Sequence, residues 1–445
     1  MTIDRRALAA VLMAVSLVTL DSSMTNTALP AIGAGLQVRP AASIWVVNAY
    51  QLAVVAALLP FAALADRLGA RRVHLFGLAF FVLASAVSAL AWSLPALVLG
   101  RALQGLGAAA TMSVNVALVR QLYPAHRLGR GVGLNALVVG VSFALGPTLA
   151  SLVLAVLPWP WLYALNLPLG ALAFLVARAS LPHGGPRSQQ PFDALGALLT
   201  ALTFACALGA LATAAQRGAA TLALTLVLVA LIGGALLLRR QAGHAAPMLP
   251  VDLLRRPLFA LSVATSMCSF AAQGLAFVSL PFFIEAVLQR DPVQTGFLIA
   301  PWAIVVAAGA PLAGRLSDRY PPGLMGGVGL LLLGTGLALL ALLTPVASTG
   351  AIVWRMALCG LGFALFQSPN LNALMSSAPP ERSGGASAMV AMARLNGQAS
   401  GAALVALCFG LAGGRGPVWA LWLGAGLATV AALASSARLC VSRAD

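Results

Sequence analysis

Long apolar runs make up most of the chain, and the short segments between them hold most of the charged residues. A helix that crosses the hydrocarbon core of a bilayer needs about 20 predominantly apolar residues. Fourteen runs approach or exceed this length, at 7–32, 42–64, 73–92, 95–119, 130–156, 159–181, 192–215, 219–238, 258–286, 294–314, 323–344, 349–374, 384–410 and 417–437. We therefore expect an all-α membrane protein with fourteen spans, and an even number of spans places both termini on one side.

The composition supports the same conclusion. The chain has 445 residues, of which 61% are hydrophobic and only 8% are charged, whereas a soluble domain carries about 25% charged residues. The formal charge of +16 could indicate a nucleic-acid partner. The basic residues, however, are dispersed among short loops between apolar runs, so we expect a lipid bilayer as the partner and no nucleic acid.

The positions of the arginines predict the orientation in the membrane. All 26 basic residues are Arg, and with a cytoplasmic N-terminus 19 of them fall in inside loops and tails, four in outside loops and three within spans. An excess of Arg in short cytoplasmic loops is the usual rule for membrane proteins. We therefore expect a multi-pass protein of the bacterial cytoplasmic membrane with both termini in the cytoplasm.

The sequence contains no pattern typical of an enzyme. Five cysteines lie within or at the ends of apolar runs, without a CxxC or Cys/His spacing. No glycine-rich nucleotide loop follows a strand, and no soluble stretch is long enough for an ATPase. We therefore expect a non-enzymatic secondary transporter without a cofactor; the coupling ion, for which we expect protons, depends on the resemblance described below.

Two internal echoes indicate a repeat of six spans. Leu64-Ala65-Asp66-Arg67 after the second span resembles Leu316-Ser317-Asp318-Arg319 after the tenth. Arg101 with Gly105 and Gly107 resembles Arg355 with Gly360 and Gly362. The predicted organisation is an N-terminal six-helix half at 1–182, an inserted two-helix linker with its loops at 183–256, and a C-terminal six-helix half at 257–445. In transporters built from two such halves, the substrate site lies between them near the membrane midplane.

Short motifs occur along almost the whole chain in a characteristic order. They are Thr19-Leu20-Asp21 with Asn26 and Pro30, Trp45 with Tyr50, Asp66-Arg67-Leu68-Gly69-Ala70-Arg71-Arg72, Gly100-Arg101 with Gln104, Gly146-Pro147, Trp161 with Asn166 and Pro168, Phe192-Asp193 with Gly196, and Arg394 with Gly397 and Gly401. In this set and order they resemble the major facilitator superfamily, and within it the 14-span drug:proton antiporters of the multidrug efflux type. The resemblance implies the major-facilitator fold and proton-driven export of small molecules.

Asp21 is the candidate proton carrier. It is the one acid well inside a span, and an ionisable group in the membrane marks function by default. Asp21 lies 14 residues from the start of its span at Ala7, which is about 21 Å, and so about 9 Å below the outer face of a 30 Å core. Arg101 lies six residues into the fourth span, at about the same depth. We therefore expect Asp21 and Arg101 to pair and to form the proton-coupling site.

Two further motifs predict conformational roles. Asp66 is expected to make a charge contact that holds one conformation, Gly69 to permit a tight turn, and Arg67, Arg71 and Arg72 to line the same gating loop or to anchor it to the inner leaflet. The resemblance assigns Gly146-Pro147 to the antiporter motif, where a kink and close helix approach are expected. An ordinary proline kink is the alternative.

The candidate cargo pocket is less well defined. Its members are polar, aromatic or basic side chains placed within or near spans: Asn26, Trp45, Tyr50, Gln104, Arg355 and Arg394. The main expectation is a monomeric exporter of drug-like or toxic small molecules. The alternatives are an exporter of an anionic or neutral metabolite that uses the intramembrane arginines, and a transporter-like sensor without flux.

Overall fold

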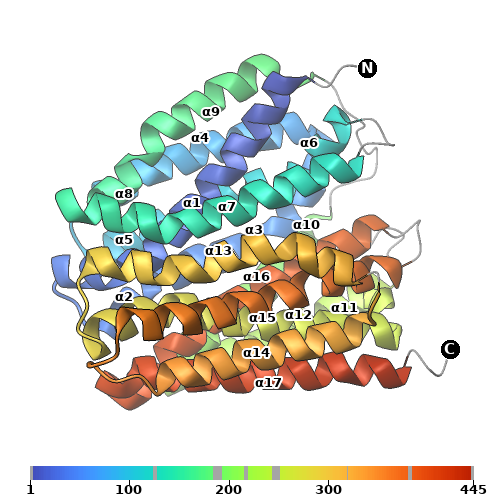
Figure 1. Cartoon of the computed structure of the whole chain (residues 1–445). Coiled ribbons are helices and arrows are strands. Elements are labelled where there is room, and N and C mark those ends of the chain that lie inside the picture. Colours follow the sequence, from blue (N-terminus) through green and yellow to red (C-terminus); the bar gives the residue numbers. More distant parts are fainter. Residues whose placement is uncertain are drawn as a thin grey trace. The chain divides into compact units, whose positions relative to one another are not determined.

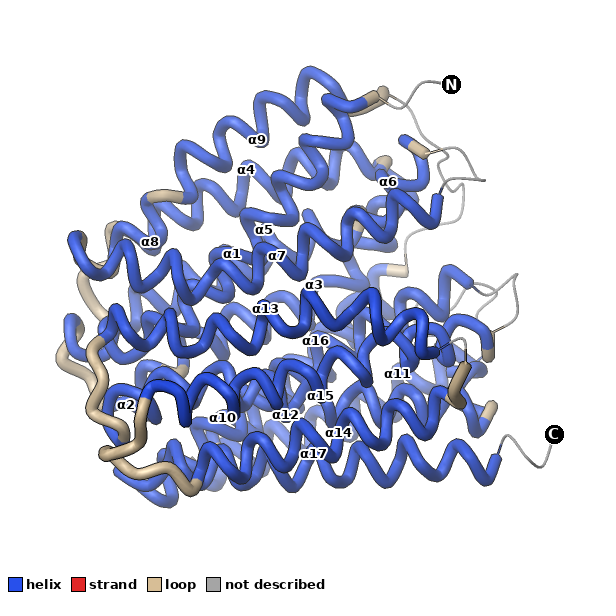
Figure 2. The backbone as a smooth tube through the Cα atoms, viewed as in Figure 1, coloured by secondary structure: helices blue, strands red, loops and turns tan. Residues whose placement is uncertain are grey.

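A computed structural model describes residues 4–123, 128–183, 193–214, 219–242, 251–317, 319–378 and 383–441. Throughout these ranges the regular structure is helical, as Figures 1 and 2 show. The chain divides into two compact units, one of Met1–Ala210 with Leu222–Leu237 and the other of Leu211–Thr221 with Leu238–Asp445. The expected all-α membrane architecture is therefore confirmed.

The first unit contains the helices of the N-terminal half. They are α1 (Arg5–Gly35), α2 (Pro40–Ser43), α3 (Trp45–Leu68), α4 (Ala70–Ala89), α5 (Leu94–Ser113), α6 (Asn115–Leu122), α7 (Leu128–Val156), α8 (Pro160–Ala164) and α9 (Asn166–Ser180). Single residues at Val114 and Leu165 separate α5 from α6 and α8 from α9. The fourth and sixth expected spans are thus each built from two consecutive helices.

The second unit contains the helices of the C-terminal half. They are η2 (Val251–Arg255), α12 (Pro257–Phe282), η3 (Phe283–Val287), α13 (Pro292–Ser317), α14 (Pro322–Ala341), α15 (Thr349–Ser376), α16 (Ser383–Ala412), η5 (Gly413–Arg415) and α17 (Gly416–Val441). The inserted helices α10 (Ala194–Thr213) and α11 (Ala220–Ala242) are divided between the units, with most residues of each in the first. Asp193 caps α10 by accepting the Gly196 N–H at 2.8 Å.

Thirteen apolar segments in the described ranges are long enough to cross a membrane. The last of them, Gly385–Cys440, has 56 residues, which as one helix would be more than twice as long as a bilayer core is thick. It consists of α16 and α17 joined by the short η5 turn. Counted as helices, the segments therefore number fourteen, as the hydrophobic pattern predicts.

The two units repeat the same packing arrangement. In the first unit α1 packs on α7 and α9, α4 packs on α5 and α9, and α3 packs on α5. In the second unit α12 packs on α16 and α17, α14 packs on α15 and α17, and α13 packs on α15. The helix pairs named in one unit thus have counterparts in the other, which explains the sequence echoes.

The echoed glycines make equivalent contacts in both units. A Cβ at Gly105 would lie 2.5 Å from the Tyr50 carbonyl oxygen of α3, and a Cβ at Gly360 would collide with the Trp302 carbonyl oxygen of α13. Only a residue without a side chain permits this backbone approach. The repeated glycines therefore mark where the α5 and α15 backbones lie against their neighbours.

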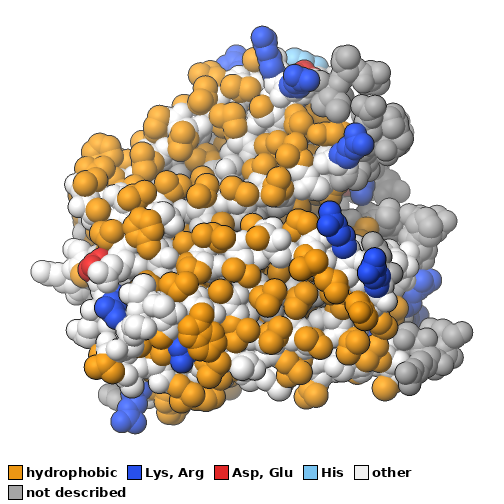
Figure 3. Space-filling model, viewed as in Figure 1, with side chains coloured by type: hydrophobic (Ala, Val, Ile, Leu, Met, Phe, Trp, Pro, Cys, Tyr) orange, Lys and Arg blue, Asp and Glu red, His pale blue; other side chains and the backbone are white. Residues whose placement is uncertain are grey.

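The outer surface of the helices is apolar. Exposed large side chains include Leu83 at 67%, Leu175 at 61% and Leu231 at 67%. On the face shown in Figure 3, hydrophobic side chains cover the middle of the helices and arginines lie toward their ends. This distribution suits hydrocarbon around the middle and headgroups at the ends.

Candidate functional site

Asp21 lies on the long helix α1, and only 2% of its surface is exposed. The buried residues of α1 that precede it, from Ala7 to Val18, are all apolar. From Thr19 to Thr27 most buried residues are polar. Asp21 therefore lies in a polar band inside an apolar helix bundle, where an unpaired carboxylate would be costly.

Arg101 of α5 is the counter-ion of Asp21. Its Nη1 lies 2.5 Å from Asp21 Oδ2, and the Arg101 side chain is 1% exposed. The pairing expected from the two depths is thus present. A buried pair of this kind persists only if its remaining donors and lone pairs are satisfied.

Two amides complete the shell around the carboxylate. Asn166 donates to Asp21 Oδ1 at 2.6 Å, and Gln104 donates to the same oxygen at 3.3 Å. Asn166 is the first residue of α9, directly after the break at Leu165, so the interruption of the sixth span places this amide. Asp21 therefore accepts hydrogen bonds from α5 and α9 and ties three helices together.

Gln104 is held in one orientation by its own partners. Its Nε2 also donates to Ser85 Oγ at 2.7 Å, while its Oε1 accepts from Arg101 Nη1 at 2.8 Å and from Ser88 Oγ at 3.0 Å. Ser85 in turn donates to the Phe81 carbonyl at 2.8 Å. A fully satisfied network of this kind is rigid and fixes the geometry of the ion pair.

Arg101 has partners besides the carboxylate. Its guanidinium carbon lies 4.2 Å from the ring centre of Tyr50 and 5.5 Å from that of Tyr163, and its Nε donates to the Val46 carbonyl at 3.3 Å. A guanidinium over an aromatic face gains cation–π attraction, which is stronger when it is desolvated. Arg101 therefore has favourable contacts that do not depend on the carboxylate.

Proton exchange at Asp21 stays a prediction, and the contacts of this carboxyl group show what such an exchange would change. The protonated and ionised forms of a carboxyl group differ in how strongly they hold Arg101, because only the ionised form carries the opposite charge. Three helices meet at this group. A change of protonation therefore alters the forces between α1, α5 and α9.

The predicted gating loop lies at the junction of α3 and α4. Gly69 has φ 95°, so this position needs glycine, as expected. Arg71 donates to the Arg178 carbonyl in the last turn of α9 at 2.7 Å. Asp66, Arg67 and Arg72 are exposed, and within the described ranges Asp66 forms no ion pair. Its role in gating stays a prediction, and its echo Asp318 lies outside the described residues.

Gly146 and Pro147 lie within α7, in the part that faces α1. A Cβ at Gly146 would collide with Ser23 Cβ and Oγ, so glycine is required for this close approach. Ser23 Oγ donates to the Phe143 carbonyl at 2.8 Å. The expected close helix approach at the motif is present, and its role in antiport stays a prediction.

The predicted pocket residues are dispersed. Tyr50 and Gln104 contact Arg101, while Asn26 on α1 is buried with its Oδ1 unpartnered. Trp45 is half-buried at the start of α3. In the second unit Arg355 lies 4.4 Å from the Trp354 ring centre and donates to the Ala351 carbonyl at 2.7 Å. Arg394 is half-buried, and no acceptor for it is found among the described residues. Whether these six residues contact cargo stays a prediction.

Sequence reasoning missed four residues that contribute to buried polar networks. Ser85 and Tyr163 carry no distinguishing sequence signal, whereas Asn166 belongs to a motif already recognised in the sixth span. Arg438 lies beyond the expected end of the last span, but α17 extends to Val441 and Arg438 is only 2% exposed. Its Nη1 donates to Asn370 Oδ1 at 2.7 Å and to Ser262 Oγ at 3.1 Å.

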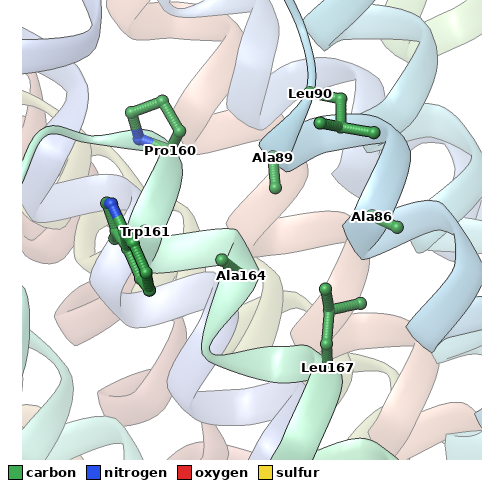
Figure 4. A pocket seen from close by; sticks show the side chains of 7 residues that line it. All are labelled: Ala86, Ala89, Leu90, Pro160, Trp161, Ala164 and Leu167. Carbon is green, nitrogen blue, oxygen red and sulfur yellow. The ribbon is translucent and has the colours of Figure 1, made fainter.

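One apolar depression lies away from the ion pair. Figure 4 shows its lining at the ends of α4, α8 and α9: Ala86, Ala89, Leu90, Pro160, Trp161, Ala164 and Leu167. No side chain in this lining is charged, and Leu90 is 76% exposed. The depression is therefore part of the lipid-facing surface.

Among the described residues no cluster of His, Cys, Asp and Glu could hold a metal ion.

Comparison with known proteins gives relatives over almost the whole chain. The chain is 48% identical over 434 residues to the Uncharacterized transporter YebQ of Escherichia coli, covering 97% of this chain and 95% of that protein. It is 32% identical over 423 residues to the Multidrug resistance protein Stp of Mycobacterium tuberculosis, covering 92% of this chain and 75% of that protein. It is 28% identical to the Multidrug efflux pump LfrA of Mycolicibacterium smegmatis, covering 91% of this chain and 80% of that protein.

Solved structures show the same fold. A peptide transporter POT in complex with sulfate superposes with a TM-score of 0.73 at 16% identity, covering 97% of this chain and 94% of that one. The family description Major Facilitator Superfamily matches residues 11–402. The chain therefore belongs to the major facilitator superfamily and is a membrane transporter.

Proposed function

We propose that this transporter is a proton-coupled antiporter that exports drug-like or toxic small molecules by alternating access. The observation that carries the proposal is the ion pair between Asp21 and Arg101, 2.5 Å apart and almost fully buried. A buried pair is weak evidence for stability, because replacing it with apolar groups is often neutral or favourable. Its presence in a membrane span is better explained by a function.

The proton step follows from the contacts of the pair. With Asp21 ionised, α1 is held to α5 through Arg101 and to α9 through Asn166. Protonation removes the charge that attracts Arg101, while the rings of Tyr50 and Tyr163 and the Val46 carbonyl still hold the guanidinium. The bundle thus has two charge states with different forces between its helices, and coupling needs such a pair of states.

Proton coupling is assigned to the N-terminal half alone. Arg355 is the echo of Arg101, but within the described ranges it has no acidic partner. It lies over Trp354 instead, and its Nη1 donates to a carbonyl of its own helix. The corresponding helix α12 carries Gln273, which is paired with Gln398 at 3.3 Å. The two halves therefore have the same fold and different charge chemistry.

The relatives named as multidrug resistance and efflux proteins support export of drug-like compounds. We also propose a location in the bacterial cytoplasmic membrane with both termini in the cytoplasm, supported by the Arg distribution, and function as a monomer. A second candidate is export of an anionic or neutral metabolite. Arg394 within α16, for which the described residues supply no acceptor, favours it, because a guanidinium in a span recognises carboxylate or phosphate groups.

The test uses the purified protein in liposomes with an imposed pH gradient, a pH-sensitive dye inside, and fluorescent cationic, neutral and anionic compounds. Asp21→Asn keeps the size and polarity of the side chain and removes its charge. We expect it to abolish gradient-driven transport and cargo-induced proton movement while cargo exchange without a gradient persists.

Glu285→Gln is the matched control, since Glu285 is a half-buried acid in η3 at the end of another span. It should leave proton-driven transport unchanged. Proton-driven transport by Asp21→Asn at the wild-type rate would refute the proposal. Preference for anionic compounds would replace the drug-export assignment with the second candidate.

A further inference from the structure

Pro147 leaves one backbone carbonyl of α7 without its normal partner. In an α-helix the N–H of residue 147 would donate to the carbonyl of residue 143. Proline has no N–H, so the Phe143 carbonyl does not receive this hydrogen bond. Inside a membrane such a group is satisfied by a neighbouring helix, a Ser or Thr side chain, an ordered water or a local change of helix geometry.

Ser23 of α1 supplies that donor. Its Oγ lies 2.8 Å from the Phe143 carbonyl oxygen, and the side chain is 1% exposed. Other helical serines of this chain, such as Ser85 and Ser180, donate to a carbonyl four residues back in their own helix. Ser23 instead donates across to α7, at the one carbonyl that the proline of the motif releases.

Gly146 makes this contact possible. A Cβ there would collide with the Ser23 side chain and would lie 3.2 Å from the Met24 backbone nitrogen. A second contact joins the same helices seven residues earlier on α1, where Ser16 Oγ lies 2.6 Å from Ser142 Oγ. Ser16 and Ser23 lie on one face of α1, because seven residues make nearly two helical turns.

Asp21 and Ser23 lie on different sides of α1. Two residues along a helix differ by about 200° in direction. Asp21 accordingly contacts Arg101 of α5, while Ser23 contacts α7. Any rotation or shift of α1 that follows a change at Asp21 therefore moves the donor that holds the Phe143 carbonyl.

We propose that Ser23 is a positioning residue that transmits the charge state of Asp21 to the proline break of α7. Gly146 and Pro147 have complementary parts in this link, since one opens the space for the hydroxyl and the other frees the acceptor. The proposal rests on the proposed function, in which Asp21 is the proton carrier. It adds a mechanical connection between that site and the motif in the fifth span.

The test is a cycle of Ser23→Ala and Pro147→Ala, with Ser16→Ala as the matched control on the same helix face. Ser23→Ala should slow gradient-driven transport about five- to tenfold, as expected for the loss of one buried hydrogen bond, and leave cargo exchange unchanged. In Pro147→Ala the backbone N–H of residue 147 can satisfy Phe143. Adding Ser23→Ala to Pro147→Ala should therefore cause no further loss, and Ser16→Ala should transport at the wild-type rate. An equal loss from Ser23→Ala with and without Pro147 would overturn the proposal.

Backbone hydrogen exchange of the α7 peptide around Phe143 separates this proposal from the proposed function. Asp21→Asn should change the exchange of this peptide about fivefold when Ser23 is present and leave it unchanged in Ser23→Ala. If Asp21→Asn abolishes proton coupling without any change in α7, the link is wrong and the proposed function stands. If α7 responds but Asp21→Asn transports normally, the link stands and the proposed function is wrong.

Discussion

The loss of Arg101 should destabilise the protein more than the loss of the charge on Asp21, and the two losses should be strongly coupled. Arg101→Met keeps the length of the side chain and strands a carboxylate that is 2% exposed. Removing one partner of a buried pair costs about 3–5 kcal/mol. Asn166 and Gln104 continue to donate to the carboxylate, so we place the cost at the lower end, about 3 kcal/mol.

Asp21→Asn strands the guanidinium instead, but Arg101 has further support. The rings of Tyr50 and Tyr163 lie 4.2 and 5.5 Å away, and each contributes about 0.5–2 kcal/mol. The Val46 carbonyl and Gln104 Oε1 also accept from Arg101. We expect a loss of about 1–2 kcal/mol. The double variant leaves neither charge buried. Its loss of unfolding free energy should therefore be smaller than the sum of the losses in the two single variants, by about 2 kcal/mol or more.

The measurement is reversible unfolding in mixed micelles, followed by the fluorescence of the eight tryptophans. Arg101→Met should be less destabilised at acidic pH, because protonation neutralises the stranded carboxylate, and the penalty should grow as pH rises. Arg355→Met is the control, since the same substitution at the equivalent position strands no acid and should show no such pH dependence. Additive losses within about 0.5 kcal/mol, or an equal pH dependence in the control, would refute the reasoning.

Three further predictions concern the loop, the packing and the topology. Asp66→Asn should lower the turnover of transport several-fold with an unchanged amount of folded protein in size-exclusion chromatography, and wild-type turnover would leave the loop as an anchor only. Gly105→Val and Gly360→Val should each destabilise the protein by about 1–3 kcal/mol in the same micelle assay, because their side chains would meet a backbone carbonyl. Gly133→Ala, with open space around its Cβ position, should not. A reporter that is active only outside the cytoplasm should stay inactive when fused to the C-terminus, and activity there would reverse the predicted orientation.

The architecture could be predicted from the amino-acid sequence. Fourteen apolar runs predicted the helices because a bilayer core requires about 20 apolar residues per span, whatever the neighbouring helices are. The repeated glycines and Asp-Arg pairs predicted equivalent halves. Because the rise per residue of a helix is fixed, counting residues from the start of each span also predicted that Asp21 and Arg101 lie at the same depth in the membrane.

The partners of the buried charges could not be predicted in the same way, because they depend on how the helices pack. Sequence spacing gives depth along a helix, but which helices face each other depends on packing among many spans. The contacts of Asp21 with Asn166 and of Gln104 with Ser85 join residues far apart in the chain. The burial of Arg438 likewise depends on α12 and α15, which supply Ser262 and Asn370. The proline motif predicted a kink and a close helix approach in α7, but the hydrogen bond from Ser23 on α1 to the Phe143 carbonyl appears only when the two helices are packed together.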